Sequence, residues 1–516
     1  MNRLKLSIIF LSCLLAFETN NIFAQTLTID SCRNMALRHN KGSQISDESL
    51  LVAQENRKAA FTQFLPNFNA VGTYNYNSKN ISMLSNDALL PVGSINTSTG
   101  GFTYHYDATD ANNCDMLTTK LPNGAVVPIN AQGQPTTDPT QFVPKHVAYL
   151  PKSALSYDIE NVFTAGIGFT QPIFMGGKIF ELYKMSKTAE NIASLTKQNK
   201  DINILIQVDE AYWRVVSLQK KCDLAREYNL LLKTTYSNVN EMYKEGVVTN
   251  ADLLKVKVKL NESEMTVTKA ENGLRLAKMG LNQICGMPLN TDYTLDDIAH
   301  VDPDNLQLND SIHRDLSSRV ETQLLDQSVN IAKSEVNIAR SRFMPNIVAT
   351  GNYILSNPNI YNGFDKSFKG MFTFGVGITV PIFHWGERLH TLSAAKHQLK
   401  IAELTRDESI EMMELQANMQ QNKKNESLKQ DLMATNNMAQ AEENLRQAQL
   451  GFKEGVLSTS DLMEAQTSWV SAKSDVIDAK INMLLSNLYL KQSLGKVEVP
   501  KIDKNTKSSK NNTNKR

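Results

Sequence analysis

Two stretches of the chain keep the period of an α-helix over an unusual length. Residues 178–245 and 387–450 contain neither glycine nor proline. In the first stretch apolar side chains recur after three or four positions, the spacing of a coiled-coil seam, as at Leu182, Met185, Ala189 and Ile192. At about 1.5 Å per residue, residues 178–245 predict a helix on the order of 100 Å long, far beyond the helices of compact domains. The sequence therefore predicts two rod-like helices.

Both rods belong to an internal duplication. Each is preceded by the sequence Pro-Ile-Phe, which begins at Pro172 and again at Pro381, and 381 − 172 gives an offset of 209. Glycines follow both rods at the same offset, and one register without gaps carries residues 162–286 onto 371–495. Chance does not hold one offset over so long a span, so the chain repeats one helix–strand–strand–helix unit.

Four segments alternate between apolar and polar positions, which is the period of a β-strand. They cover residues of about 67–76, 162–171, 346–355 and 371–380. Such alternation, with aromatic side chains near the ends, is typical of strands that cross a membrane, and an ordinary β-sandwich hairpin would give the same pattern. Four strands do not close a barrel, and an open edge in lipid leaves backbone groups unpaired at a cost of several kcal/mol each. Membrane strands would therefore require several chains in one barrel.

The first copy is longer than the second between its two strands. Pro66 and Pro345 precede the first strand of each copy at an offset of 345 − 66 = 279, whereas the second strands are 209 apart. The first copy therefore holds 279 − 209 = 70 extra residues. They lie within residues 77–161, which are rich in Asn, Thr, Gly and Pro and predict a long, mobile loop.

The N-terminus has the layout of a secretory signal peptide. Arg3 and Lys5 flank the start of an apolar stretch over residues 6–17, which is too short to span a bilayer, and Ala24 offers a small residue for cleavage. The whole chain then divides into a signal peptide (1–24), a first repeat (25–286) with a helix over 250–285, a linker (287–319), a second repeat (320–495) with helices over 387–454 and 460–494, and a polar tail (496–516) that is expected to be disordered.

Composition adds mainly exclusions. No run in the mature chain reaches 18 apolar residues, so no helix is expected to cross a membrane, although an exported chain can also cross as a barrel. The net charge of +1 gives no reason to expect a nucleic acid partner. Of the five cysteines, the four in the mature chain lack C-x-x-C spacing and do not form a disulfide framework in so long a chain: Cys32, Cys114, Cys222 and Cys285.

No catalytic, cofactor-binding or metal-binding arrangement stands out in the sequence. His390 and His397 lie seven residues apart on one predicted rod without an H-E-x-x-H motif, and His384 lies at a strand-to-helix corner. We assign these histidines surface or packing roles. We therefore expect neither an enzyme nor a metal protein.

Together these features resemble the TolC-like outer-membrane efflux protein family. The resemblance covers nearly the whole mature chain and rests on the order and twofold repetition of its landmarks. They are the N-terminal segment Leu27–Leu37 with Asn40, the helix-to-strand prolines Pro66 and Pro345, the Pro-Ile-Phe entries, the turn glycines Gly246 and Gly455, and the closing glycines Gly286 and Gly495.

The resemblance implies a fold and a function. The fold would be mainly α with transmembrane β, in a homotrimer whose chains give four strands each to a twelve-stranded β-barrel continuous with a long periplasmic α-helical barrel. The function would be a passive exit duct of a tripartite efflux or type I secretion system, exporting drugs, small molecules or polypeptides across the outer membrane. Implied partners are a periplasmic adaptor (membrane fusion protein), an inner-membrane pump of the RND or ABC type, and outer-membrane lipid. The alternatives are a trimeric structural or adhesive coiled-coil surface protein, or a general porin.

The resemblance also suggests a channel constriction at the second turn. Asp461 and Glu464 match the two carboxylates that line the periplasmic constriction in family members, and a ring of carboxylates would favour cations and repel anions. An acidic residue followed by Glu three positions later at a helix start is equally a capping arrangement, and Thr249 with Asp252 repeats that pattern in the first copy.

Closure of that constriction is expected to rest on apolar packing. Leu457 and Phe452 replace the Arg and the Tyr that hold the closed turn in the family's pattern, so we expect Phe452, Val456 and Leu457 to form the contact. The adaptor is expected to contact the turns themselves, at Gly246, Val247, Gly455 and Val456.

Overall fold

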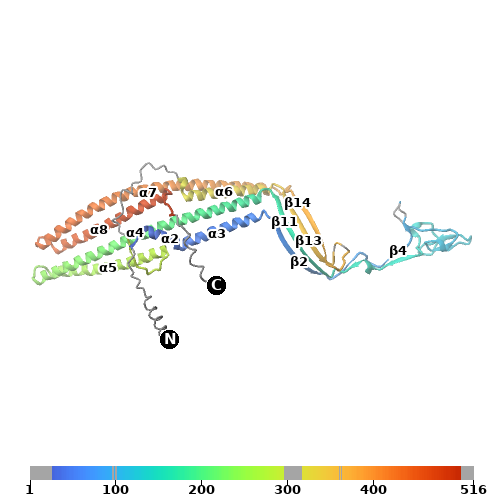
Figure 1. The fold of residues 1–516 in the computed structure, drawn as a ribbon, viewed down its shortest axis with the longest axis horizontal. Coiled ribbons are helices and arrows are strands. Elements are labelled where there is room, and N and C mark those ends of the chain that lie inside the picture. Colours follow the sequence, from blue (N-terminus) through green and yellow to red (C-terminus); the bar gives the residue numbers. More distant parts are fainter. Residues whose placement is uncertain are drawn as a thin grey trace, which may run out of the picture. The chain divides into compact units, whose positions relative to one another are not determined.

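The computed structural model falls into two compact units (Figure 1). A helical unit comprises residues 1–62, 176–344 and 381–516, and a sheet unit comprises 63–175 and 345–380. The structure describes residues 26–95, 98, 102–295, 316–359, 361 and 363–500. The expected signal peptide, most of the polar tail and part of the linker lie outside these ranges. Within them, no helix is long and apolar enough to pass through a lipid bilayer.

The helical unit is built from two matching sets of helices. They are α2 (Ile29–His39), α3 (Lys41–Thr62), α4 (Lys178–Lys244) and α5 (Asn250–Cys285) from the first repeat, and α6 (Val320–Ser341), α7 (Glu387–Lys453) and α8 (Thr459–Ser493) from the second. The rods α4 and α7 are 67 residues each, and each ends one residue before its expected end. Two short strands, β1 (Thr26–Leu27) and β12 (Thr294–Leu295), pair in parallel beside them.

Each rod packs against the two shorter helices of its own repeat. Helix α4 lies along α3 and α5, α7 lies along α6 and α8, and α4 also contacts α6 and α8 (Figure 1). Where α2 crosses α4 and α5, side chains such as Ala36, Val208 and Leu281 are completely buried. Most of the stability of such helices comes from this packing of apolar faces rather than from intrinsic helix propensity.

A pair of glycines starts the first rod. Gly176 and Gly177 have φ angles of 63° and 84°, a left-handed conformation that other residues adopt only at a cost. A Cβ on Gly176 would also lie 2.6 Å from the backbone oxygen of Ser341. Gly386 takes the same conformation, with φ 83°, before the second rod. The glycines of the Pro-Ile-Phe entries therefore set the corner at which strand becomes helix.

The sheet unit holds one antiparallel sheet of four strands. They are β2 (Asn67–Tyr76), β11 (Asn161–Met175), β13 (Asn346–Asn357) and β14 (Lys369–Thr379), in the spatial order β14-β13-β11-β2. Strand β11 continues beyond its expected end to Met175, through a register shift between Pro172 and Phe174. A bulge of this kind re-aims the end of a strand.

The register places apolar side chains on one face of this sheet. Ile167 lies opposite Ala70 on β2 and Tyr353 on β13, and Tyr353 lies opposite Phe372 on β14. This face is exposed in the single chain, with Phe372 at 66%. Small and polar side chains occupy much of the other face, among them Thr73, Thr164, Asn352, Ser356 and Thr373. The period-two pattern thus predicted the two faces correctly.

The inserted residues 77–161 have more local structure than a loop. Short strand pairs join β3 (Ile81–Ser82) to β10 (Ser156–Tyr157), β4 (Ala88–Pro91) to β9 (Val147–Leu150), β5 (Ser94–Ile95) to β6 (Phe102–Thr103), and β7 (Thr118–Lys120) to β8 (Val126–Pro128). Cys114, Met116 and Val126 form a small core of their own. The sequence predicted a long loop and indicated no strands in it, because strands of two to four residues are too short for a period to show.

We expect the apolar face of the sheet to contact lipid, which gives a first prediction. Ile167→Arg should destabilise the protein in a bilayer by about 2–4 kcal/mol, because it places a charge in hydrocarbon. The matched substitution Thr164→Arg, on the other face of the same strand, should be tolerated. Urea unfolding in lipid vesicles measures both, and equal losses would contradict the assignment of the faces.

Candidate functional site at the helical turns

The two turns that end the rods share one backbone geometry. In the first turn Gly246 has φ 76°, and its N–H donates to Tyr243 O at 3.0 Å while the Val247 N–H donates to Met242 O at 2.9 Å. This pair of bonds is a Schellman motif, which satisfies the last carbonyls of a helix and favours glycine at its left-handed position. Gly455, with φ 73°, closes the second rod with the same pair of bonds.

A capping box starts the helix after each turn. The Ser458 hydroxyl donates to Asp461 Oδ2 at 2.7 Å, the Ser458 N–H donates to the same oxygen at 3.0 Å, and the Asp461 N–H donates to Ser458 Oγ at 3.2 Å. Thr249 and Asp252 form the same box at the start of α5. Asp461 therefore has a capping role, but its partner is Ser458 and not Glu464, whereas Asp252 pairs with Thr249 as expected.

These hydrogen bonds also change the acidity of the two carboxyls. The hydrogen bond from the Ser458 side chain, followed by the one from its backbone, lowers the pKa of Asp461. The hydrogen bond from the Thr249 side chain is the main cause that lowers the pKa of Asp252. Both groups are fully ionised at neutral pH, so they add negative charge to the turns and stabilise the positive ends of the helix dipoles.

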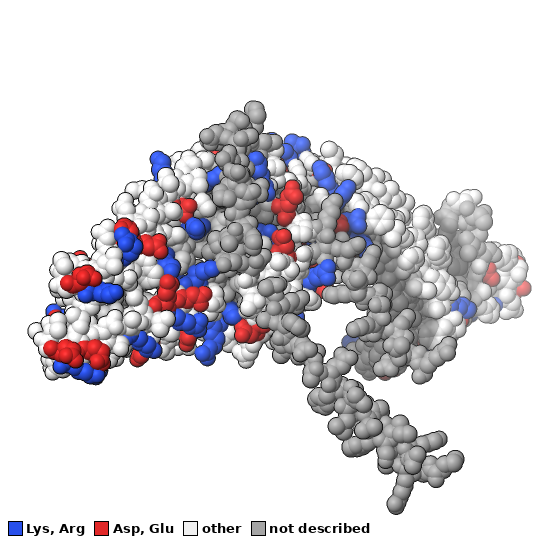
Figure 2. Space-filling model, turned by 60° about the vertical axis from the view of Figure 1, so that its left-hand side comes forward, with Lys and Arg blue, Asp and Glu red and all other residues white. Residues whose placement is uncertain are grey.

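The outermost side chains of the two turns are apolar. Val247 is 67% exposed, and Val456, at the equivalent position, is 79% exposed. Leu457 is more covered because it lies on Gly451, where an added Cβ would come within 2.9 Å of its Cδ1. Glu464 is exposed on α8. Acidic and basic side chains are mixed over the surface of the helical unit, and both signs occur near the two turns (Figure 2).

Phe452 lies elsewhere than expected. It is buried in a cluster with Leu445, Leu462 and Trp469 from α7 and α8 and with Val239 from α4. Its side chain fills the core between the two helical hairpins, so it does not line an opening. The spacing of seven residues from Leu445 to Phe452, which puts both on one helix face, was the signal that could have placed it.

The structure also brings together residues that the sequence did not single out. Lys221 on α4 contacts Asp478 on α8 at 2.7 Å, and Glu227 on α4 contacts Lys473 on α8 at 2.7 Å. Further along the same pair of helices, the buried amide of Gln466 donates to Thr235 Oγ1 at 2.9 Å, and Tyr489 donates its hydroxyl hydrogen to Glu210 Oε1 at 2.5 Å. Burial, reinforced by this bond, raises the pKa of Tyr489 to about 12.

These four contacts, which we call the α4–α8 ties, join the hairpin of the first repeat to the hairpin of the second. Their partners lie more than 200 residues apart in the sequence. Any movement that separates the hairpins must break them.

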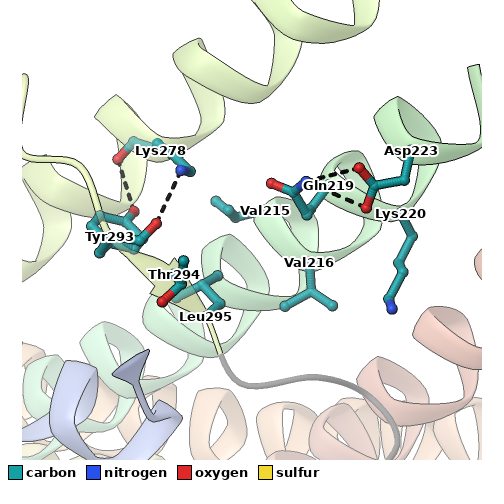
Figure 3. A pocket seen from close by; sticks show the side chains of 9 residues that line it. All are labelled: Val215, Val216, Gln219, Lys220, Asp223, Lys278, Tyr293, Thr294 and Leu295. Carbon is teal, nitrogen blue, oxygen red and sulfur yellow. Dashed lines mark hydrogen bonds between the residues drawn. The ribbon is translucent and has the colours of Figure 1, made fainter. Parts of the chain in front are cut away.

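A pocket of about 180 Å³ lies between α4, α5 and β12 (Figure 3). Its polar groups are engaged with one another: Lys278 Nζ donates to Tyr293 O at 3.0 Å, the Tyr293 hydroxyl donates to Lys278 O at 3.2 Å, and Gln219 donates to Asp223 at 3.2 Å. No set of side chains converges on its interior as a catalytic site requires. In the part of the chain that the structure describes, no group of three His, Cys, Asp or Glu residues could hold a metal ion.

Comparison with known proteins identifies the family. The family model described as "Outer membrane efflux protein" matches residues 149–287 and 314–496, which is more than half of the chain. The chain therefore belongs to the outer membrane efflux protein family, which confirms the resemblance seen in its sequence.

Several named relatives and solved structures are similar. The alkaline protease secretion protein AprF of Pseudomonas aeruginosa is 21% identical over 62% of this chain and 67% of the relative. The outer membrane protein TolC of Vibrio cholerae is 19% identical over 65% of this chain and 77% of the relative. The structure of CusC matches with a TM-score of 0.67 at 14% identity over 90% of this chain and 91% of that chain. The outer membrane channel CmeC of Campylobacter jejuni matches with a TM-score of 0.66 at 16% identity over 92% and 87%.

These findings confirm three of the predictions from the sequence. The fold is that of the TolC-like channels, the location is the bacterial outer membrane, and the chain is an exit duct for export. Family membership thus favours the duct over an adhesive coiled coil or a general porin.

A second prediction concerns the capping box of α8. Ser458→Ala should destabilise the start of this helix by about 1 kcal/mol, because the Asp461 N–H loses its acceptor and the Asp461 carboxylate loses the hydroxyl that donates to it. Hydrogen–deuterium exchange of the peptide over residues 456–465 should become faster, with no change at the first turn. Thr249→Ala is the matched control. It should make exchange faster at the first turn and leave the second turn unchanged.

The pH dependence follows from the lowered pKa of Asp461. The stabilisation by the ionised carboxylate is complete above the ordinary aspartate value of 3.8 and is lost as the pH falls through the lower value of the folded state. The protection of the amides at this turn, which is their exchange rate relative to the intrinsic rate at each pH, should therefore not change between pH 7 and pH 5 in the unmodified protein. A marked loss of protection over that interval would contradict the capping role.

Proposed function

We propose that three copies of the chain close into one tube through matching open ends. In the sheet unit, β2 and β14 are the outer strands of the described sheet, and they run in opposite directions because each neighbouring pair is antiparallel. Strand β14 of one copy can therefore add to β2 of the next in the same antiparallel ladder. Closure by this route would leave no unpaired edge in the membrane.

The helical unit also has two open ends. Helix α3 packs on α4, α4 on α6 and α6 on α7, while α5 packs on α4, α4 on α8 and α8 on α7. Helices α3 and α5 thus stand at one end of the wall and α7 at the other. Both ends expose apolar side chains, which include Ile45 and Val52 on α3, Val258 and Met265 on α5, and Ile401, Leu404, Met412 and Leu415 on α7. Contact between α7 of one copy and α3 and α5 of the next would cover them.

The tube would act as a passive duct that is opened and supplied by partners. Relatives bear names of efflux-pump outer membrane proteins and of a protease secretion protein, and this supports an export system with an adaptor and an inner-membrane pump. The exposed valines Val247 and Val456 are the surface that we assign to the adaptor. We assign no chemical reaction to the chain, since the duct needs only to be opened.

The turns would form the gate of this duct. Three copies would bring Asp461 and Glu464 into one ring of negative charge around the axis, where poorly screened carboxylates favour cations. Val456 and Leu457 would pack beside this ring. Opening would move the α7–α8 hairpin away from the α4–α5 hairpin and would break the α4–α8 ties.

A third prediction tests the charged ring. In planar bilayers, Asp461→Asn combined with Glu464→Gln should lower the preference of the purified trimer for cations and its block by trivalent cations, because the ring loses its charge. Asp252→Asn in the first turn is the control for loss of a capping carboxylate. Unchanged selectivity in the double variant would leave Asp461 with the helix cap alone.

A fourth prediction tests the ties between hairpins. Asp478→Asn combined with Glu227→Gln removes the charge from both ion pairs, and the closed trimer should then conduct more. The two pairs are largely solvent-exposed, so the effect on stability should be small. Glu443→Gln, which breaks a pair within α7 alone, is the control. Conductance no higher than in this control would show that the ties do not restrain the gate.

The export role is tested in the bacterium that carries the protein. Deletion of the chain should make cells sensitive to exported compounds or abolish secretion of a polypeptide, and the unmodified chain should restore export. Val247→Asp with Val456→Asp should fail to restore it although trimers form, since charges replace the apolar contacts of the adaptor. Full restoration by this variant would remove the turns from the adaptor interface.

A further inference from the structure

The insertion of the first repeat contains a two-stranded ribbon whose two faces are left exposed by the described residues. Strands β4 and β9 pair with Leu89 opposite Tyr149 and with Leu90 opposite Ala148. Leu89 is 65% exposed and Tyr149 is 61% exposed on one face, and Leu90 is 45% exposed on the other. Both faces of the ribbon are therefore apolar and open.

The sequence of the ribbon is that of strands buried on both faces. Residues 88–92 and 147–151 are two continuous runs without a charged or polar side chain other than the hydroxyl of Tyr149. An exposed antiparallel ribbon would alternate apolar and polar positions, whereas unbroken apolar runs are typical of strands that are covered on both sides. A two-stranded hairpin is also only marginally stable by itself.

The charged side chains lie just beyond the ribbon. Asp87 accepts hydrogen bonds from the Tyr149 hydroxyl at 2.7 Å and from the Lys152 N–H at 2.8 Å, and Lys152 Nζ donates to Ser85 O at 3.0 Å. The rest of the insertion has its own small core at Met116 and Val126 and does not need the ribbon for cover. Something outside the single chain must therefore cover these apolar faces.

Lipid is a poor cover for this ribbon. Each strand pairs on one side only within the described chain, so the outward backbone groups of both strands would be unsatisfied in hydrocarbon. A protein partner can cover the apolar faces while these backbone groups stay in contact with water. The partner nearest at hand is another copy of the chain, because the ribbon continues from β2 and β11 through the bond from Asn77 N–H to Glu160 O at 2.8 Å.

We propose that the ribbons of the three copies pack on one another around the axis of the tube, beyond the end of the sheet, and form a collar at the outer mouth of the duct. The Leu89–Tyr149 face of one ribbon would lie against the Leu90–Ala148 face of the next, which buries both faces of every copy. This inference rests on the proposed trimer and adds an interface that the barrel itself does not require.

Cysteine cross-linking on intact cells tests the collar. Leu89→Cys should give several-fold more covalent dimer with a short, membrane-impermeant bismaleimide than Asn123→Cys, a control at an exposed turn of the insertion. Three thiols around one axis form a single pair, so a dimer and not a trimer is expected. The native cysteines Cys32, Cys114, Cys222 and Cys285 are buried, and the parent chain measures their background.

Two further measurements keep the collar and the trimer separate. Co-expression of Leu89→Cys and Leu90→Cys chains with different tags should give cross-linked dimers with both tags in excess of the proportion that random pairing gives, because opposite faces meet. Equal cross-linking at residues 89 and 123 in a trimer that stays intact on unheated gels would overturn the collar alone. Loss of the trimer in the parent chain would instead overturn the proposed assembly.

Discussion

The need to hydrogen-bond the backbone N–H and C=O groups at the two edges of the four-stranded sheet is the main constraint on this structure. In lipid, no water replaces a missing partner for an N–H or C=O group, so a sheet with two open edges is not a stable membrane structure. In the sequence, β2 follows α3 and β14 precedes α7. The proposed association of copies would therefore meet both the requirement at the sheet edges and the need to cover the exposed apolar side chains of the helices.

The duplication explains why the two halves of the helical unit have the same structure, and one difference between them lies at the turns. Both rods have the same length, both end in a left-handed glycine, and both are followed by a capping box. The second turn differs because Gly451 leaves room for Leu457 to lie on α7, whereas Met242 stands at the equivalent position in the first repeat. A gate built from both turns would thus contain two kinds of turn that differ in their packing.

The sequence was most informative where one period runs through many residues. Rods of 67 residues and strands of ten or more leave a pattern that tolerates a few exceptions, and glycines with positive φ mark their ends. Phe452 was misplaced because a resemblance at one position was preferred to its own helical spacing from Leu445. The α4–α8 ties were missed because the sequence does not specify how two long helices slide against each other. The strands of the insertion were missed because pairs of two to four residues show no period.

The geometry of the turns limits how a partner can recognise them. Glycine closes each rod with two backbone hydrogen bonds, and a Ser or Thr with an Asp engages the first donors of the next helix. These backbone groups are already used, so a partner cannot add a strand or a helix end to them. A partner would instead contact the side chains of these turns. Their backbone is ordered before binding, so little conformational entropy would be lost there. Rapid and reversible engagement of the proposed adaptor is the behaviour that such a preformed contact would favour.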